Sequence, residues 1–314
     1  MLAFLGRRIL IAIPTVFLIS VFVFALQHLL PGDPILVMAG EERDPEVIAA
    51  LREKYRMNDP VPVQYLAWAG NALQGDLGIS LRTQQPVLEL IAEKLPVTIQ
   101  LAVMALIIAI LIGIPAGVLS AYKKGTWVDW LANIVALSGL SVPNFWLGIM
   151  LILLVSVKLG WLPASGYMPI SEDPLQSIRV MIMPAFVLGT ALAATLMRHT
   201  RSAMLSVLKS DYIRTARAKG LREHIVLVKH ALRNALVPVV TVITLLFGEL
   251  LAGAVLTEQI FTIPGFGKLV VDAVFNRDYA VVQGIVLCTG VAFIAMNILA
   301  DAAYRVLNPR MSDQ

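Results

Sequence analysis

Six long apolar stretches constrain the fold of this chain more than any other feature of its sequence. A helix that crosses a bilayer needs about 20 mostly apolar residues, because it rises about 1.5 Å per residue. The stretches of that length are Ile9–Leu29, Pro96–Tyr122, Trp130–Val157, Val180–Met197, Val237–Thr257 and Ala280–Tyr304. Only 15% of the residues are charged, against about 25% in soluble domains. The sequence therefore predicts an all-α integral membrane protein with six transmembrane helices.

The first stretch follows two arginines, as the apolar part of a signal peptide does. It is longer than the usual signal segment, and no small-x-small cleavage site follows it. We therefore expect an uncleaved membrane anchor.

The distribution of basic residues predicts the orientation of these helices. Six spans place both termini on one side. The segments of that side carry 15 basic residues, namely Arg7, Arg8, Lys123, Lys124, Arg198, Arg201, Lys209, Arg214, Arg217, Lys219, Arg222, Lys229, Arg233, Arg305 and Arg310. The two short loops of the other side carry 4, namely Lys158, Arg179, Lys268 and Arg277. The positive-inside rule places both termini and loop 198–236 in the cytoplasm. The net charge of +4 is thus better explained by orientation than by nucleic-acid binding.

Residues 31–95 are expected to form a small helical region outside the membrane, so that the chain divides into 1–95 and a core of five spans, 96–314. Proline and glycine at 31–34 stop the first span. Asp44-Pro45 is typical of a helix start. A second helix is expected through Val63, Leu66 and Leu73, then a turn at 75–78 and a third helix over Val87–Leu95. This region could cap a pore, receive a soluble partner or form a packed lid.

The third span is interrupted by polar residues and a proline. Pro143 removes a backbone donor, and Ser138, Ser141 and Asn144 add polar side chains. Such a stretch is tolerated in a membrane where it faces protein or a water-filled cavity. It either lines a translocation path or forms a kink satisfied by a neighbouring helix.

Glu249 is the one carboxylate deep in a predicted span. It follows Pro238 by a helical rise of about 17 Å, which places it near the middle of the membrane. Intramembrane acids are functional candidates. A cation site, a proton relay, a contact to a substrate amine and a structural acid all remain open.

No catalytic site is apparent. The four histidines show no metal-binding spacing, the single cysteine, Cys288, excludes an intrachain disulfide, and no phosphate-binding loop or nucleophile elbow occurs. We expect no enzyme, no metal site and no cofactor on this chain.

Residues 210–238 form a basic island between two apolar spans. Ser210 or Asp211 can cap a short helix, Gly220 can end it, and a second helix can start near Glu223. The predicted result is a helix–turn–helix elbow. It could lie on anionic lipid, or its small residues around Gly220 could dock into a protein cleft.

The elbow resembles the cytoplasmic loop of ABC-importer permeases of the dipeptide, oligopeptide and nickel branch. In that branch ARAKGL followed by HALRNA and a proline is typical, as at 216–221 and 230–238. Further similar segments are RRILIAIPTVFLISVFVF at 7–24, LPGDP at 30–34, PVPVQYLAW at 60–68, GDLGISLRTQQPV at 75–87, SVPNFWLG at 141–148, GWLPASGY at 160–167, TEQIFTIPGFGKL at 257–269 and LNPRM at 307–311. Arg214 or Thr215 stands where the family pattern has a glutamate.

This resemblance implies a type I importer permease fold in the bacterial cytoplasmic membrane. It implies a second homologous permease, two ATP-binding subunits that hold ATP and Mg²⁺, and an external substrate-binding protein. It also implies that ATPase coupling is carried by Asp211, Tyr212, Arg214, Thr215, Ala216, Arg217, Ala218, Lys219, Gly220 and Leu221. Ser138, Ser141, Pro143, Asn144 and Glu249 are candidate pore-side residues.

Two alternatives stay open. An ion-coupled secondary transporter or channel could use Glu249 without any ATPase. The importer role could also serve a nickel chelate, glutathione or an opine instead of a dipeptide or short oligopeptide.

Overall fold

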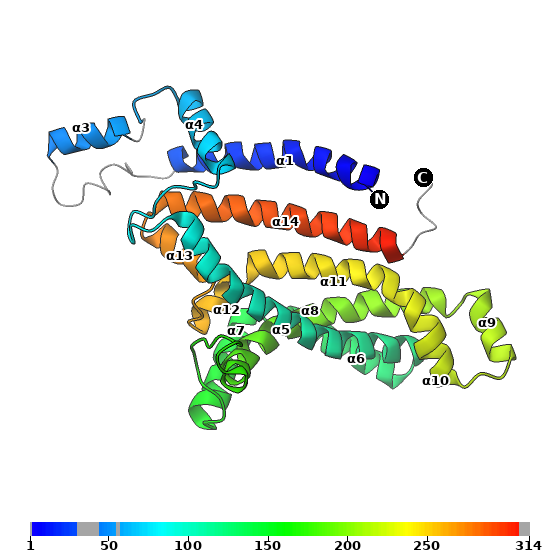
Figure 1. Ribbon diagram of the computed structural model, residues 1–314. Helices are drawn as coiled ribbons and strands as arrows, with labels where there is room; N and C mark the ends of the chain where they lie inside the picture. The colour runs from blue at the N-terminus through cyan, green and yellow to red at the C-terminus, as the bar shows by residue number, and fades with distance from the viewer. Residues whose placement is uncertain (1, 30–43, 55–56, 308–314) are drawn as a thin grey trace. The chain divides into compact units, whose positions relative to one another are not determined.

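The computed structural model describes residues 2–29, 44–54 and 57–307 (Figure 1). These residues are mostly helical, and within them β pairing is limited to one isolated bridge between Ile79 and Pro86. The all-α prediction is therefore confirmed for the described part of the chain. The predicted stop at 30–34 and the terminal segment from 308 onwards lie outside the described residues.

Packing divides the chain into two units. The first groups Met1–Pro96 with Pro264–Ile294, and the second groups Val97–Ile263 with Ala295–Gln314. This grouping follows side-chain packing rather than chain order, so the predicted division into 1–95 and 96–314 stays a prediction.

The first unit holds α1 (Leu2–Leu29), α3 (Pro45–Lys54), α4 (Val61–Leu73) and α13 (Phe266–Phe275) with the starts of α5 (Val87–Tyr122) and α14 (Tyr279–Leu307). The expected start at Asp44-Pro45 is confirmed, since the Asp44 carboxylate accepts the Glu46 N–H at 3.0 Å. The helix through Val63 to Leu73 is confirmed as α4. Its Tyr65 packs edge-on against Phe24 of α1 and shares a 2.8 Å hydrogen bond with the Ser20 hydroxyl.

The second unit holds the rest of α5 and α14 with α6 (Trp127–Ser141), α7 (Asn144–Leu151), η1 (Ile152–Lys158), α8 (Pro174–Val207), α9 (Asp211–Ala218), α10 (Glu223–Ile225), η2 (Val226–Leu232), α11 (Arg233–Gly253) and α12 (Val255–Ile260). Helix α8 is the centre of this unit, because α6, α7 and α11 all pack on it. Its buried face includes Met181, Leu188 and Leu196.

Helices α5 and α8 cross at glycines. A Cβ on Gly113 would lie 2.8 Å from the Ala193 carbonyl oxygen, and one on Gly117 would lie 2.7 Å from that of Met197. Both distances are too short for a side chain, so the two backbones touch only because these positions are glycine. The spacing of four residues places both glycines on one helix face.

Five of the described helices are long and apolar enough to cross a membrane. They comprise Gly6–Ala25, Val87–Tyr122, Pro174–Val207, Glu223–Leu251 and Tyr279–Ala303. The sixth predicted span is present as the pair Trp127–Ser141 and Asn144–Lys158, whose axes differ by 93°. The chain therefore has six spans if this bent pair counts as one.

The break in the third span occurs at Val142 and Pro143. Proline pushes the residue before it out of the helical region, and Val142 has φ −80° and ψ 121°. Pro143 is itself extended, with φ −62° and ψ 131°, and α7 starts at Asn144. The predicted kink is thus a complete interruption of the helix.

One predicted boundary was wrong. Residues Val87–Leu95 were expected to form a separate outer helix before a span that starts at Pro96, yet α5 runs through both without a break. Val87, Leu90 and Ile91 are buried against Val281 and Ile285 within the first unit. Because this burial fixes the helix before Pro96, the missing proline N–H removes one hydrogen bond without ending the helix.

Candidate functional site

The basic island forms the helix–turn–helix elbow that the sequence predicts. Helix α9 ends at Ala218, and Gly220 adopts φ +73°, a left-handed conformation that favours glycine. The next helix begins at Glu223. Figure 1 shows α9 beyond the ends of α8 and α11 in the second unit. The expected side-chain cap is not made by Ser210, whose hydroxyl donates instead to the Val207 carbonyl at 2.6 Å.

Helix α9 has an inner face that packs against its own chain. Ile213 is fully buried and Ala216 is 7% exposed, in a cluster with Met204 of α8, Ala121 of α5 and Val226 of η2. The small side chain of Ala216 therefore lets α9 lie close to this cluster. Because Ala216 is buried within its own chain, its exposed neighbours on α9, and not Ala216 itself, would make the predicted contact with a partner subunit.

The outer face of α9 and the turn that follows it carry the other predicted coupling residues. Each of them is exposed: Asp211, Tyr212, Arg214, Thr215, Arg217, Ala218, Lys219, Gly220 and Leu221. Three are basic, and their charges lie around a short stretch of small residues. This face offers a partner both shape and positive charge.

Two polar contacts hold α9 to the helix that follows it. The Asn234 side chain donates to the Tyr212 hydroxyl at 2.9 Å. Arg217 donates to both carboxylate oxygens of Glu223, at 3.2 and 2.7 Å, across the turn at Gly220. Hydrogen bonding to this carboxylate raises the pKa of Arg217 above its ordinary value. The elbow is thus tied on both sides of its turn.

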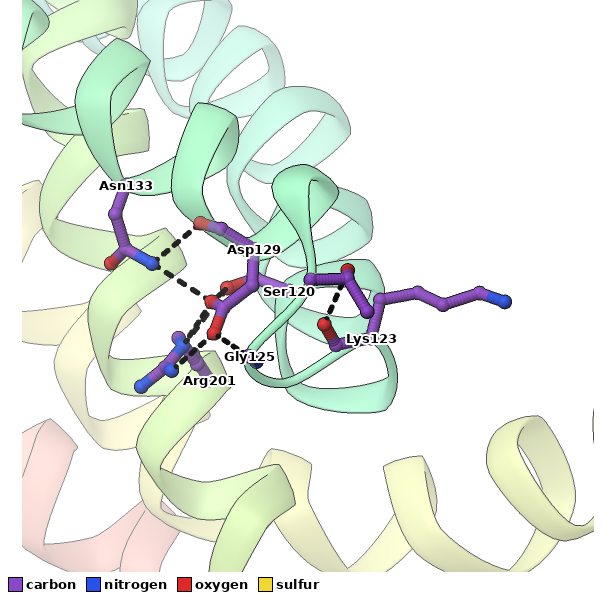
Figure 2. Close-up of polar contacts among 7 residues, drawn as sticks. Ser120, Lys123, Gly125, Asp129, Asn133 and Arg201 are labelled. Atoms are coloured by element: carbon purple, nitrogen blue, oxygen red, sulfur yellow. Dashed lines mark hydrogen bonds and ion pairs between the residues drawn. The ribbon is translucent and has the colours of Figure 1, made fainter.

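A buried polar cluster lies beneath the elbow, and we call it the base cluster: Ser120, Gly125, Asp129, Asn133 and Arg201 (Figure 2). Arg201 of α8 donates two hydrogen bonds to the Asp129 carboxylate of α6, both of 2.9 Å. The Ser120 hydroxyl of α5 donates to the same carboxylate at 2.5 Å and accepts from Arg201 at 2.9 Å.

Two more donors complete the base cluster. The Gly125 N–H reaches the Asp129 carboxylate at 3.0 Å, and the Asn133 amide reaches it at 2.8 Å. Gly125 has φ +78° in the turn between α5 and α6, so glycine suits this position. Asp129 is only 6% exposed and Ser120 is fully buried. A buried carboxylate with this many donors keeps its charge and fixes three helices at one point.

The base cluster and the cluster around α9 share their helices. Ser120 directly precedes Ala121, and Arg201 lies one turn before Met204. Ala121 and Met204 both contact the core formed by Ile213 and Ala216. Helix α9 therefore packs on the same turns of α5 and α8 that the Asp129 carboxylate joins.

The predicted pore-side residues of the third span satisfy themselves locally. The Ser138 hydroxyl donates to the Ile134 carbonyl at 2.9 Å, and that of Ser141 donates to the Leu137 carbonyl at 2.8 Å. Both serines and Pro143 are exposed within this chain, and Asn144 is half-buried. The alternative of a kink satisfied by a neighbouring helix therefore finds no support in these two serines.

Glu249 is exposed on α11, although its neighbours Leu246 and Leu250 are buried. Helix α11 and helix α6 both pack on α8. A charged carboxylate in hydrocarbon is unfavourable, so an exposed one within a span must face water or protein.

A second acid in this region was missed by the sequence reasoning. Glu258 in α12 is fully buried and accepts a 2.5 Å hydrogen bond from the Thr98 hydroxyl of α5. Glu249 is therefore not the only carboxylate of the second unit within or directly beside a predicted span. Glu258 and Asp129 each fall one residue outside a predicted span, so an acid directly beside an apolar stretch was the available signal for both.

Within the described residues, no group of three His, Cys, Asp or Glu side chains is placed to hold a metal ion.

Two family models match this chain. Residues 113–313 match the binding-protein-dependent transport system inner membrane component, and residues 1–102 match the N-terminal part of the membrane component of the same systems. Together these matches include the elbow, the base cluster and the broken third span.

Several curated proteins are similar over their whole length. An oligopeptide transport system permease of Bacillus subtilis is 45% identical over 318 residues, covering 99% of both chains. A di/tripeptide transport system permease of Pseudomonas aeruginosa is 44% identical and covers 100% of both. A glutathione transport system permease of Escherichia coli is 42% identical and covers 98% of both.

The solved structures add a likeness of fold. A chain of the MetNI methionine ABC transporter in an inward-facing conformation superposes with a TM-score of 0.57 at 17% identity, covering 69% of this chain and 96% of that one. The fold is thus that of a type I ABC importer permease.

Proposed function

The chain belongs to the family of binding-protein-dependent transport system inner membrane components, and on that premise we propose that it forms half of the pore of an ATP-driven importer of short peptides. Relatives named for oligopeptides and for di- and tripeptides support a peptide as cargo. The glutathione named for another relative is itself a tripeptide. Membership in this family implies, in general, a second permease, ATPase subunits and an external binding protein.

The observation that carries the coupling proposal is the two-sided character of α9. Its inner face is fixed in the core of its own chain, while nine predicted coupling residues stay exposed on the outside. A helix packed in this way can be displaced by a partner that binds its exposed face. The displacement then reaches the rest of the chain through the buried face. We propose that an ATPase subunit with bound ATP and Mg²⁺ contacts that exposed face.

The pore-side proposal rests on exposed polar groups within spans. Ser138, Ser141 and Glu249 are accessible on helices that pack on α8. A charged Glu249 is unfavourable in contact with lipid, and the two exposed hydroxyls can also bond to water. We propose that they face the passage between this chain and the second permease. Support for an ion-coupled transporter is weaker, because that alternative gives the elbow no role.

The proposed orientation places the elbow and both termini in the cytoplasm of a bacterium, with the chain in the cytoplasmic membrane. The excess of basic residues on that side supports it.

Reconstitution of the whole importer tests this function. The permease pair and the ATPases are placed in liposomes, and uptake of a labelled dipeptide is measured with and without the loaded binding protein. The variant Ala218→Trp adds bulk to the exposed face of α9 and leaves the buried face intact. Uptake and substrate-stimulated ATP hydrolysis should both fall by about tenfold or more, as expected when a well-packed interface is blocked.

Ser202→Trp is the matched control, since Ser202 is exposed on α8 and outside the predicted contact. It should keep wild-type rates. Uptake by the wild type without ATPases, driven by an ion gradient, would contradict the proposal. Full activity of Ala218→Trp would contradict the role of α9.

A further inference from the structure

We infer that Ser120, Asp129 and Arg201 are positioning residues that carry the movement of α9 into the membrane-spanning helices. This inference rests on the proposed function of α9. None of the three residues lies in the elbow, and none touches a partner or cargo in the proposal. They act through the helices that they join.

The bonding geometry of the base cluster joins three helices at one point. Asp129 lies in the first turn of α6, Ser120 in the last turn of α5, and Arg201 in the last two turns of α8. Figure 2 shows their side chains meeting. Arg201 grips both oxygens of the carboxylate and the Ser120 hydroxyl as well. A planar guanidinium bonded in this way resists rotation as well as separation, because two parallel bonds fix its plane. Three helices are thus joined as one body at this end.

The base cluster also lies next to the residues on which α9 packs. Ala121 and Met204, which neighbour Ser120 and Arg201, are two of the residues on which Ile213 and Ala216 rest. Force on α9 therefore reaches α5 and α8 within one turn of the base cluster. Helix α6 has no residue in that core. It packs on α8 further along, where Ala136 meets Ala194 and Met197, and the Asp129 carboxylate joins its first turn to α5 and α8. The base cluster therefore fixes the start of α6 to the same turns of α5 and α8 that α9 contacts.

The base cluster has more hydrogen bonds than a merely stabilising ion pair needs. Buried ion pairs stabilise little over apolar residues of equal volume, because desolvation offsets their attraction. A charge pair with several further donors is therefore better explained by a demand for a fixed geometry than by stability. A fixed geometry is expected where the movement of one helix has to move its neighbours by the same amount.

The test measures the number of ATP molecules hydrolysed per dipeptide imported by the complete complex in liposomes. Arg201→Met removes the grip on Asp129, and Arg201→Lys keeps the charge without the parallel bonds. Arg198→Met is the control, since Arg198 is exposed three residues earlier on the same helix. We expect the ratio to rise by about two- to thirtyfold in Arg201→Met, the range found for mutations along coupling routes. It should rise less in Arg201→Lys and stay at the wild-type value in Arg198→Met.

A purely structural role would lower hydrolysis and import together and leave their ratio unchanged, which would overturn the inference. If Arg201→Met does not assemble, Ser120→Ala serves instead, because it removes only one hydroxyl. An unchanged ratio in both Ser120→Ala and Arg201→Lys would equally overturn it. The wild-type complex in the same preparation distinguishes failure of the proposed function from failure of this inference. If the wild type shows no ATP-driven import, the proposed function fails and the inference fails with it. If the wild type imports and only the ratios stay unchanged, the inference alone fails.

Discussion

Helix α6 carries polar side chains near each end, and the two ends differ in the burial and the hydrogen-bond partners of these side chains. At its start, Asp129 is buried and bonded to side chains of α5 and α8. At its end, Ser138 and Ser141 bond only back to carbonyls of α6 and remain exposed. The start is therefore fixed by the chain itself, while the end keeps its surface free for water or for another subunit.

This difference teaches how one helix can serve both ends of a transport cycle. A rigid anchor is useful where force enters, and an uncommitted polar surface is useful where cargo passes. Substitutions at the fixed end and at polar groups that the chain leaves exposed should therefore have different effects.

The largest expected effect is on stability at the fixed end. Asp129→Asn leaves the Arg201 charge without its buried counter-charge, and breaking one side of a buried pair costs about 3 kcal/mol or more. Asp211→Asn, at an exposed acid of α9, should change stability by less than about 0.5 kcal/mol. Thermal unfolding of the purified complex in detergent measures both. Equal shifts for the two variants would show that the base cluster does not anchor α6.

The next effect concerns Glu249, which is exposed within this chain. Glu249→Gln should leave thermal unfolding within about 0.5 kcal/mol of the wild type. Peptide import should fall by about fivefold or more, because the variant removes a charge that we propose to face the passage. Glu46→Gln, at an exposed acid of α3, is the control and should import normally. A large loss of stability with normal import would instead make Glu249 a structural acid.

The smallest effect is expected for the half-exposed pair of Arg217 and Glu223. Exposed ion pairs contribute about 0–1 kcal/mol, so Arg217→Gln should lower stability by no more than that. Since pairing raises the pKa of Arg217, its contribution is present below the ordinary pKa and is lost only as pH rises through the raised one. Both values lie far above neutrality.

Stability measured between about pH 7 and 9 should therefore change with pH equally in the wild type and in Arg217→Gln. Lys219→Gln, a nearby basic residue, is the control for loss of charge alone. A pH-dependent difference between wild type and Arg217→Gln in this window would contradict the assignment.

Much of the fold could be predicted because apolar length and glycine or proline position are local signals. The spans, the outer helices α3 and α4, the interruption at Pro143 and the elbow around Gly220 all follow from residues within a few turns of one another. The boundary at Pro96 could not be predicted in this way. It depends on the burial of Val87 and Ile91 against residues of α14, almost 200 positions later in the chain.

In the candidate site, too, the features formed by contiguous residues could be predicted, and those formed by residues far apart in the sequence could not. The elbow was found because its charge, its small residues and its glycine are contiguous. The base cluster was missed because Arg201 and Asp129 are 72 residues apart, and each alone resembles an ordinary charge at the end of a span. Glu258 was missed for a similar reason, since only packing shows that it meets Thr98.

The sequence by itself determined that this chain crosses the membrane, where its helices break, and that a basic elbow separates two of them, because hydrocarbon and backbone geometry act on each segment independently. Only the tertiary structure decided which face of α9 is buried and which polar groups find partners within the chain. Ala216 and Thr215 are neighbours of similar size, yet one is enclosed and the other exposed. That outcome depends on what the rest of the fold places beside them, and no local pattern contains it.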